Sequence, residues 1–162
     1  MDFSSYISSP LPLIDVRSPA EFEQGHVQGA HNMALFSNEE RHAVGKCYKQ
    51  QGKDAAVKLG LEYVGPKLAS FVERAEELAP EKKLVIHCWR GGMRSGSMAW
   101  LLKTAGFEVE TINGGYKAYR NWVLEVLSTK RKYFALGGFT GVGKSKILEA
   151  LEEQGEQIVH LE

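Results

Sequence analysis

The strongest constraint on the fold is a short apolar segment, residues 84–87, that runs without interruption into Cys88, a glycine-containing loop and a helix predicted at residues 96–105. Its length and composition are those of a buried strand. Further segments of these two kinds alternate along the chain: apolar runs at residues 11–16 and 107–112, and helical stripes at residues 65–79 and 116–127. Strands that alternate with helices form a parallel sheet covered by helices on both faces. We therefore predict one α/β domain over residues 1–128.

The segments between these elements give weaker signals. Residues 20–25 predict one short helical turn, and a small strand is expected near Met33 and Ala34. Residues 38–60 are polar and mostly basic in charge, with few apolar side chains before Ala55. Because the apolar periodicity is sparse there, we expect a helix with irregular flanks.

Composition limits the classes of function. The 162 residues contain 20 basic and 20 acidic side chains, so net charge gives no argument for a nucleic-acid partner. No apolar run approaches the roughly 20 residues of a membrane span, and the start of the chain lacks the pattern of a secretion signal. Two cysteines do not make a disulfide framework, so we expect a cytoplasmic protein with no membrane contact.

The loop after Cys88 has the composition of an anion site. Successive backbone N–H groups in a tight turn, together with the positive end of the following helix, attract negative charge and favour a thiolate. Gly91 and Gly92 permit positive φ, and Arg90 and Arg94 offer forked donors to phosphate-type oxygens. Cys88 is the candidate catalytic residue, and the candidate anion-binding residues follow it: Trp89, Arg90, Gly91, Gly92, Met93, Arg94 and Ser95. The other cysteine, Cys47, has no such surroundings and is expected to be an ordinary or accessory thiol.

A second motif lies in residues 129–162, a segment that opens with the basic connector at residues 130–132. A strand at residues 133–136, a glycine loop, a helix at residues 145–153 and a strand at residues 157–161 are predicted. The loop matches the phosphate-binding pattern G-x-x-x-x-G-K-S through Gly138, Gly141, Gly143, Lys144 and Ser145. Its N–H groups and Lys144 would hold a diphosphate or a nucleotide, and Ser145 would reach Mg²⁺. Because some 30 residues are too few for a nucleotide-binding domain, the segment is expected to be the start of a longer P-loop α/β unit.

Three segments resemble the rhodanese superfamily. Residues 13–22 and 25–30 are similar to its opening, and Gly114-Gly115 with Trp122 is similar to its closing element. The Cys88 loop, with five residues before Arg94, is longer than is typical of sulfurtransferases and is also similar to the loop of cysteine phosphatases. This resemblance implies a rhodanese-like fold but leaves sulfur chemistry and phosphatase chemistry both open.

The pairing of such a domain with a P-loop, together with residues 38–60, 88–95 and 114–120, resembles the bacterial tRNA 2-selenouridine synthases. That resemblance implies a transferase that replaces the sulfur of a wobble 2-thiouridine by selenium through an S-geranylated intermediate. It implies that Cys88 carries selenium, that selenophosphate and geranyl diphosphate are substrates rather than bound cofactors, and that tRNA and a selenophosphate-supplying enzyme are partners. It leaves the oligomeric state open. Basic residues expected to meet the tRNA backbone are Lys46, Lys49, Lys53, Lys58, Lys117, Arg120 and Lys130 to Lys132.

Overall fold

The structure is a computed structural model that describes residues 3–7, 9–130 and 132–159. The chain divides into two compact units, Met1–Ser128 and Thr129–Glu162. The first unit is built on a four-stranded sheet in the order β2-β1-β3-β4, and every neighbouring pair is parallel. The strands are β1 (Leu13–Asp15), β2 (His31–Asn32), β3 (Lys83–His87) and β4 (Glu108–Thr111). The predicted parallel α/β fold is confirmed, although the small strand begins two residues earlier than expected.

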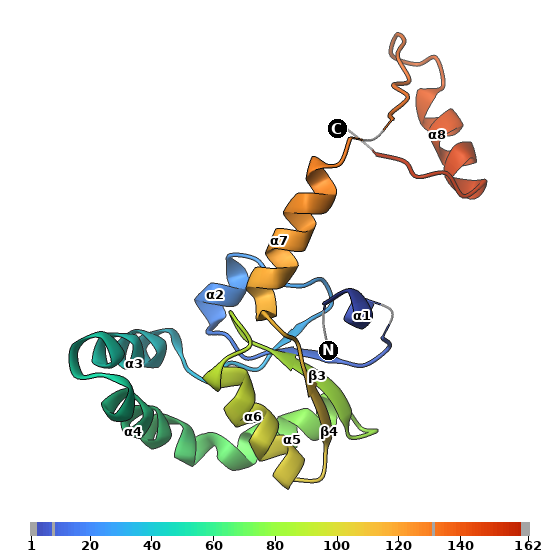
Figure 1. Ribbon diagram of the computed structural model, residues 1–162. Helices are drawn as coiled ribbons and strands as arrows, with labels where there is room; N and C mark the ends of the chain where they lie inside the picture. The colour runs from blue at the N-terminus through green and yellow to red at the C-terminus, as the bar shows by residue number, and fades with distance from the viewer. Residues whose placement is uncertain (1–2, 8, 131, 160–162) are drawn as a thin grey trace. The chain divides into compact units, whose positions relative to one another are not determined.

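Helices cover both faces of this sheet (Figure 1). Side chains alternate along β3, so Leu84 and Ile86 enter one apolar cluster while Val85 enters the other. The first cluster is packed by α5 (Leu68–Leu78) and α6 (Met93–Thr104), and the second by α1 (Phe3–Ile7) and α7 (Gly115–Ser128). The helix α2 (Pro19–Glu23) follows β1 and has a capping box formed by Ser18 and Glu21. Because β3 is buried on both faces, its carboxyl end is held firmly in the centre of the domain.

The polar segment after residue 37 is more regular than its sequence suggested. It forms two helices that pack side by side, α3 (Asn38–Gln51) and α4 (Lys53–Val64), and the short turn η1 (Gly65–Lys67) leads on to α5 (Figure 1). A capping box of Ser37 and Glu40 starts α3, and Lys67 donates to Glu40 at 2.6 Å. The expected irregular flanks are therefore wrong. Capping and a long-range ion pair, rather than buried apolar residues, mark the start of α3, whereas α4 has no side-chain cap and buries Ala56 and Gly60.

The second unit holds one helix, α8 (Lys144–Glu153), in the part that the structure describes. The predicted strand at residues 133–136 is not formed, and Phe134 is 98% exposed. Residues 157–159 are likewise not in a strand, and the rest of that predicted strand lies outside the described residues. A parallel strand needs neighbouring strands to satisfy its N–H and C=O groups. Without such neighbours in the described part of this unit, the apolar sequence alone does not produce a strand.

The helix after the cysteine loop also starts earlier than predicted. It begins at Met93 with Gly92 as its N-cap, so Met93, Arg94 and Ser95 occupy its first turn instead of the loop. No helix in the described ranges is long and apolar enough to cross a membrane.

Candidate active site

Cys88 directly follows β3, the central buried strand, and its side chain is 3% exposed. Its backbone carbonyl accepts the N–H of Tyr116 at 2.9 Å, and the carbonyl of Trp89 accepts the N–H of Lys117 at 3.0 Å. These two bonds attach the cysteine loop to the start of α7. The strand, the loop and two helices therefore fix the sulfur at the carboxyl edge of the sheet, where ligand sites of parallel α/β folds occur.

The surroundings of the sulfur favour its ionised form. Burial by itself raises the pKa of the Cys88 thiol. Hydrogen bonds from the Ser95 hydroxyl and from the backbone N–H groups of Ser95, Arg90 and Gly92 act in the opposite direction and prevail, so the pKa lies below that of an ordinary thiol. The loop therefore behaves as the predicted anion cradle toward its own cysteine.

Ser95 has a second partner that limits how it can assist the thiol. Its Oγ lies 3.3 Å from the Cys88 Sγ and 3.0 Å from the Gly92 carbonyl oxygen. A hydroxyl has one hydrogen, so it donates to the carbonyl while Cys88 is a thiol and can turn to the sulfur when Cys88 is a thiolate. Ser95 thus supplies a hydrogen bond at the moment when negative charge develops on sulfur.

This arrangement predicts how the thiol titrates. In a Cys47→Ser background, the pH midpoint for alkylation of Cys88 is expected below the midpoint of a free thiol, because the cradle stabilises the thiolate. Ser95→Ala removes one donor and should raise that midpoint. The measurement is the iodoacetamide alkylation rate, followed by intact mass over a pH series. An unchanged midpoint in Ser95→Ala would contradict the role given to the hydroxyl.

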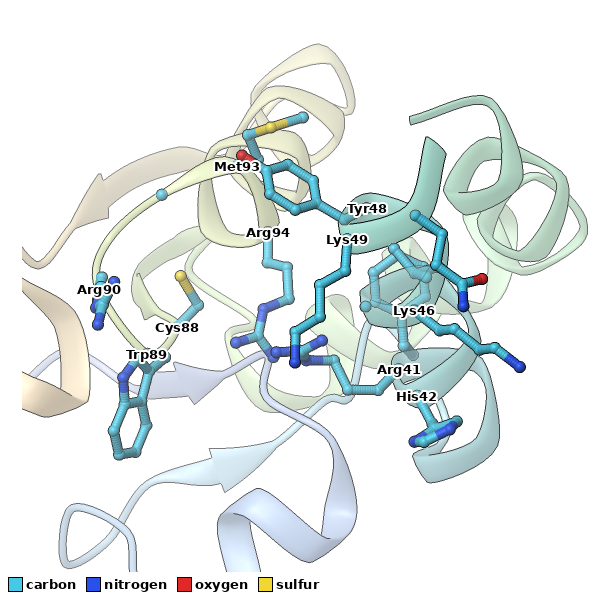
Figure 2. Close-up of a pocket in the computed structure, with 15 residues that line it drawn as sticks. Arg41, His42, Lys46, Tyr48, Lys49, Cys88, Trp89, Arg90, Met93 and Arg94 are labelled. Atoms are coloured by element: carbon cyan, nitrogen blue, oxygen red, sulfur yellow. The ribbon is translucent and has the colours of Figure 1, made fainter. Parts of the chain in front are cut away.

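The two arginines near the cysteine differ in their partners. Arg94 is bound by Glu21 of α2 through Nη1 at 2.5 Å and Nη2 at 3.2 Å, and Arg41 of α3 lies 3.8 Å from the same carboxylate. Burial raises the pKa of Glu21, but its bonds to Arg94 and Ser18 and the nearby Arg41 charge lower it overall, so the pair is ionic. The Arg90 guanidinium, by contrast, makes no hydrogen bond or ion pair with the described residues. In Figure 2 it lies on the other side of Cys88 from Arg94. Arg90 is therefore the arginine available to an incoming anion.

A cavity of about 1000 Å³ opens over the cysteine between the loop and α3 (Figure 2). Its charged lining residues are all basic, and among the described residues no aspartate or glutamate lines it. The basic lining residues are Arg41, Lys46, Lys49, Arg90 and Arg94. Such a lining selects a polyanionic ligand. Sequence reasoning expected Lys46 and Lys49 to meet tRNA but did not place Arg41, His42 or Tyr48 at the cysteine, and the weak amphipathicity of α3 gave no signal for it.

Beneath the loop lies a fully buried ion pair between Asp15 and Arg17. Arg17 Nη2 lies 2.6 Å from Asp15 Oδ2, and it also donates to the Gly25 carbonyl at 2.9 Å. The Arg17 guanidinium stacks on the Tyr116 ring, with its carbon 3.9 Å from the ring centre. His87 Nε2 lies 3.6 Å from Asp15 Oδ2, and burial lowers the pKa of His87, so the imidazole is neutral at pH 7. His87 lines no part of the cavity and supports the loop from below.

The other predicted loop residues have distinct places. Trp89 is 36% exposed, lines the cavity and packs on Tyr116 with ring centres 5.6 Å apart. Gly91 has φ +68°, and a Cβ there would lie 2.8 Å from the Ile112 carbonyl oxygen, so a side chain does not fit. Gly92 and Met93 line the cavity. The structure therefore brings the residues named for the loop around one site, with the qualification that Arg94 is held by Glu21.

The phosphate-binding motif belongs to the second unit and is described separately. Gly138, Gly141 and Gly143 all have positive φ, and Gly143 is the N-cap of α8. Lys144 Nζ donates to the carbonyl oxygens of Gly138 and Phe139, each at 2.9 Å, so the loop wraps around its own lysine. Ser145 lies in the first turn of α8 and is exposed. No group of three or more His, Cys, Asp or Glu side chains that could hold a metal ion occurs in the described ranges.

The first unit is thus a parallel α/β domain with a cysteine of lowered pKa directly after its central strand. The chain belongs to the rhodanese-like domain family, whose model matches residues 2–121. It is 40% identical over 167 residues to a tRNA 2-selenouridine synthase of Hydrogenovibrio crunogenus, covering 93% of this chain and 45% of that protein. The corresponding protein of Bordetella bronchiseptica is 42% identical, with 93% and 43% covered. The predicted resemblance is thus confirmed, and the chain spans less than half the length of these relatives.

One solved structure is similar at the level of both fold and sequence. It is the crystallised N-terminal domain of a protein named for ATP/GTP binding from Clostridium difficile 630. The TM-score is 0.73 at 44% identity, and the match covers 76% of this chain and 98% of that one.

Proposed function

We propose that this chain performs the selenium-handling step of a transferase that replaces the sulfur of a wobble 2-thiouridine in tRNA by selenium from selenophosphate. The observation that carries the proposal is Cys88, a thiol of lowered pKa at a cavity whose charged lining residues are all basic. The relatives named tRNA 2-selenouridine synthase supply the substrate class. Because the chain spans less than half of them, the complete reaction is proposed for a whole enzyme of that type.

Loading of Cys88 requires an oxidant, because selenium in selenophosphate is at the oxidation level of selenide. We take this oxidant to be a low-molecular-weight disulfide. The Cys88 thiolate attacks it, forming a mixed disulfide and releasing one thiol. Transfer of the phosphoryl group of selenophosphate to water frees selenide, which attacks Sγ of Cys88. The S–Se bond forms, the S–S bond breaks and the second thiol leaves, so Cys88 carries a terminal selenium.

Transfer to the nucleobase requires a leaving group at C2 of the uracil ring. Alkylation of the thiocarbonyl sulfur by a geranyl group provides it. The terminal selenium attacks C2, the C–Se bond forms, and the C–S bond breaks as the geranyl thiolate departs with its electron pair. A thiol then attacks Sγ of Cys88, releases the 2-selenouridine and restores the mixed disulfide. We assign selenophosphate binding to Arg90, and the loop N–H groups stabilise the sulfur whenever it is anionic.

The second unit is assigned to the diphosphate. Geranyl diphosphate, or a nucleotide, binds the loop formed by Gly138, Gly141, Gly143, Lys144 and Ser145, with Mg²⁺ held at the Ser145 hydroxyl. A diphosphate must take Lys144 Nζ from the two carbonyl oxygens to which it donates. These ligands are substrates, so no tightly bound cofactor is assigned. The tRNA backbone is assigned to basic residues of α3, α4 and α7 that include Lys49, Lys53, Lys58, Lys117 and Arg120.

The test is selenium uptake by the chain. After incubation with selenophosphate and a symmetric disulfide, intact mass is expected to show a selenium adduct in the wild type and in Cys47→Ser. In the Cys47→Ser background, Cys88→Ser should show none, because no thiol remains to form the mixed disulfide. Disulfide alone should give only the mixed disulfide at Cys88. Selenium uptake that survives Cys88→Ser would overturn the assignment of the carrier.

Two related chemistries are less well supported. A cysteine phosphatase shares the spacing of His87, Cys88 and Arg94 but needs a general acid, and no carboxylate in the described part of the chain lines the cavity. Its arginine must also bind phosphate, whereas Arg94 is held by Glu21. In a simple sulfurtransferase, Cys88 would take up sulfur from thiosulfate as readily as it takes up selenium from selenophosphate. In an inert binding module, Cys88 would react with a thiol probe no faster than Cys47 does.

A further inference from the structure

Two arginines from different helices share one carboxylate at the wall of the cysteine cavity. Glu21 of α2 accepts hydrogen bonds from Arg94 of α6, and Arg41 of α3 lies 3.8 Å from the same carboxylate. Both arginines line the cavity, whereas Glu21 does not. Figure 2 shows the two arginine side chains pointing toward each other, while Arg90 lies on the other side of the cysteine. The cavity therefore has a second basic group that is separate from Arg90.

Arg41 has hydrogen-bonding capacity that the described part of the protein does not use. Its guanidinium makes no hydrogen bond with the described residues, and its Nε atom is buried without a partner. The 3.8 Å contact with Glu21 is an ion pair that is too long for a hydrogen bond. Because a buried donor without a partner destabilises a structure, the Arg41 guanidinium is suited to gain its partner from a bound oxyanion.

Gly45 allows the Arg41 head group to lie where it does. It follows Arg41 by four residues in α3, and a Cβ built on it would lie 2.8 Å from Arg41 Nη1. Gly45 does not have a positive φ, so the backbone does not require glycine there. Glycine is also less favourable inside a helix than any residue except proline. Its effect at this position is to leave room for the guanidinium against the helix.

The charge and the place of this arginine pair favour one class of ligand. Two guanidinium groups and one carboxylate have a net charge of +1, which matches the single negative charge of a phosphodiester better than the higher charge of a free selenophosphate. The cavity of about 1000 Å³ has room for a nucleotide as well as for a small anion. In a nucleotide the phosphate and the base lie apart, as the arginine pair and the cysteine loop do here.

We infer that Arg41, together with Arg94, binds a backbone phosphate next to the nucleotide whose base reacts at Cys88. The inference rests on the proposed function and deepens it, because it assigns the contact that positions the substrate nucleotide. The phosphate accepts hydrogen bonds from Arg41, while Glu21 keeps both guanidinium groups at the cavity wall. A phosphate held at this place restricts the position of the attached base relative to the sulfur.

The experiment uses trinucleotides with a central 2-thiouridine, in which the phosphodiester on its 5′ or its 3′ side is replaced by an uncharged methylphosphonate. Binding to the 162-residue chain is measured by isothermal titration calorimetry at constant ionic strength. The wild type is expected to lose about tenfold in affinity when one of the two linkages is neutral, as for the loss of one charged hydrogen-bonded contact. In Arg41→Gln, this loss should shrink to within about threefold.

Gly45→Ala is the second variant, because it displaces the Arg41 head group but keeps its charge. It should also reduce the effect of the neutral linkage to within about threefold. Gly96→Ala is the matched control, since Gly96 is inside α6 and a Cβ built on it meets no atom within 4 Å. This control should keep the tenfold effect of the wild type. Circular dichroism compares the fold of each variant with that of the wild type.

The outcomes separate this inference from the proposed function. If the wild type takes up selenium at Cys88 but binds charged and neutral trinucleotides equally, only the inference fails. Absence of selenium uptake in the wild type would contradict the proposed function instead. If Gly45→Ala and Arg41→Gln keep the tenfold effect, another residue binds the phosphate and the inference is wrong. It is also wrong if Arg41→Gln slows selenium uptake while the effect of the neutral linkage stays tenfold, because Arg41 then binds the selenium donor.

Discussion

Asp15→Ala is expected to lower the free energy of unfolding of the first unit by about 3–5 kcal/mol, as is typical when one partner of a buried ion pair is removed. Both side chains of the Asp15–Arg17 pair are fully buried. Without the carboxylate, the Arg17 guanidinium keeps the backbone carbonyls of Glu21 and Gly25 and its contacts with the rings of Tyr116 and Trp89, none of which carries a negative charge. A buried charge with too few partners destabilises the folded state strongly.

Urea unfolding followed by circular dichroism measures this effect as a lowered midpoint at unchanged slope. Glu77→Ala is the matched control, because it removes one carboxylate from an exposed pair with Arg74 and should change stability little. The double variant Asp15→Leu/Arg17→Met replaces both charges by apolar groups and should recover most of the loss. If Asp15→Ala and Glu77→Ala lower the free energy of unfolding equally, the buried pair does not stabilise the first unit more than an exposed pair does.

Gly115→Ala is expected to destabilise the first unit by about 3 kcal/mol or more and to displace the cysteine loop. Gly115 has φ +55°, and a Cβ there would lie 2.2 Å from the Cys88 carbonyl oxygen and 2.8 Å from the Gly91 nitrogen. Those atoms belong to the backbone of the loop, so they cannot move without changing the N–H groups around the sulfur. The pH midpoint for alkylation of Cys88 should therefore rise together with the loss of stability.

Gly29→Ala separates the two causes of this effect. Gly29 has φ +78° but no atom lies within 4 Å of a Cβ built on it, so its substitution carries only the conformational penalty of about 1–2 kcal/mol. The difference between the two variants, from parallel urea titrations, measures the steric cost at the loop. If Gly115→Ala behaves like Gly29→Ala in stability and in Cys88 reactivity, the close packing of the loop on α7 is not important.

Local sequence determined the central strand and the position of the cysteine. The apolar run of β3 and the turn after it depend on neighbouring residues, because a buried strand is encoded by its own side chains and a loop by its glycines. The candidate thiolate and its N–H cradle could therefore be predicted from residues 84–95 alone. The glycine loop at residues 138–145 was recognisable for the same reason, since its backbone conformation follows from its own composition.

The sequence was less informative wherever an element depends on distant partners. Helix α3 forms one wall of the cavity. It has no buried residue, so the sequence of this helix showed no apolar stripe. The predicted strands of the second unit failed because strands are completed by other strands, which that unit lacks in its described residues. An apolar groove beside the site could not be predicted from the sequence either. Its lining residues come from α4, α5 and α6 and from the connections near them, and only folding brings these segments together.

The sequence by itself determined that this protein carries a cysteine at the end of a central strand in a parallel α/β domain. Only the tertiary structure decided which of the two arginine side chains is held in an ion pair. Arg94 is paired with Glu21, a residue 73 positions away in the chain, and Arg90 is not. Ion pairs and cavities form between segments that folding brings together, and their energies depend on distances that no local pattern of residues encodes.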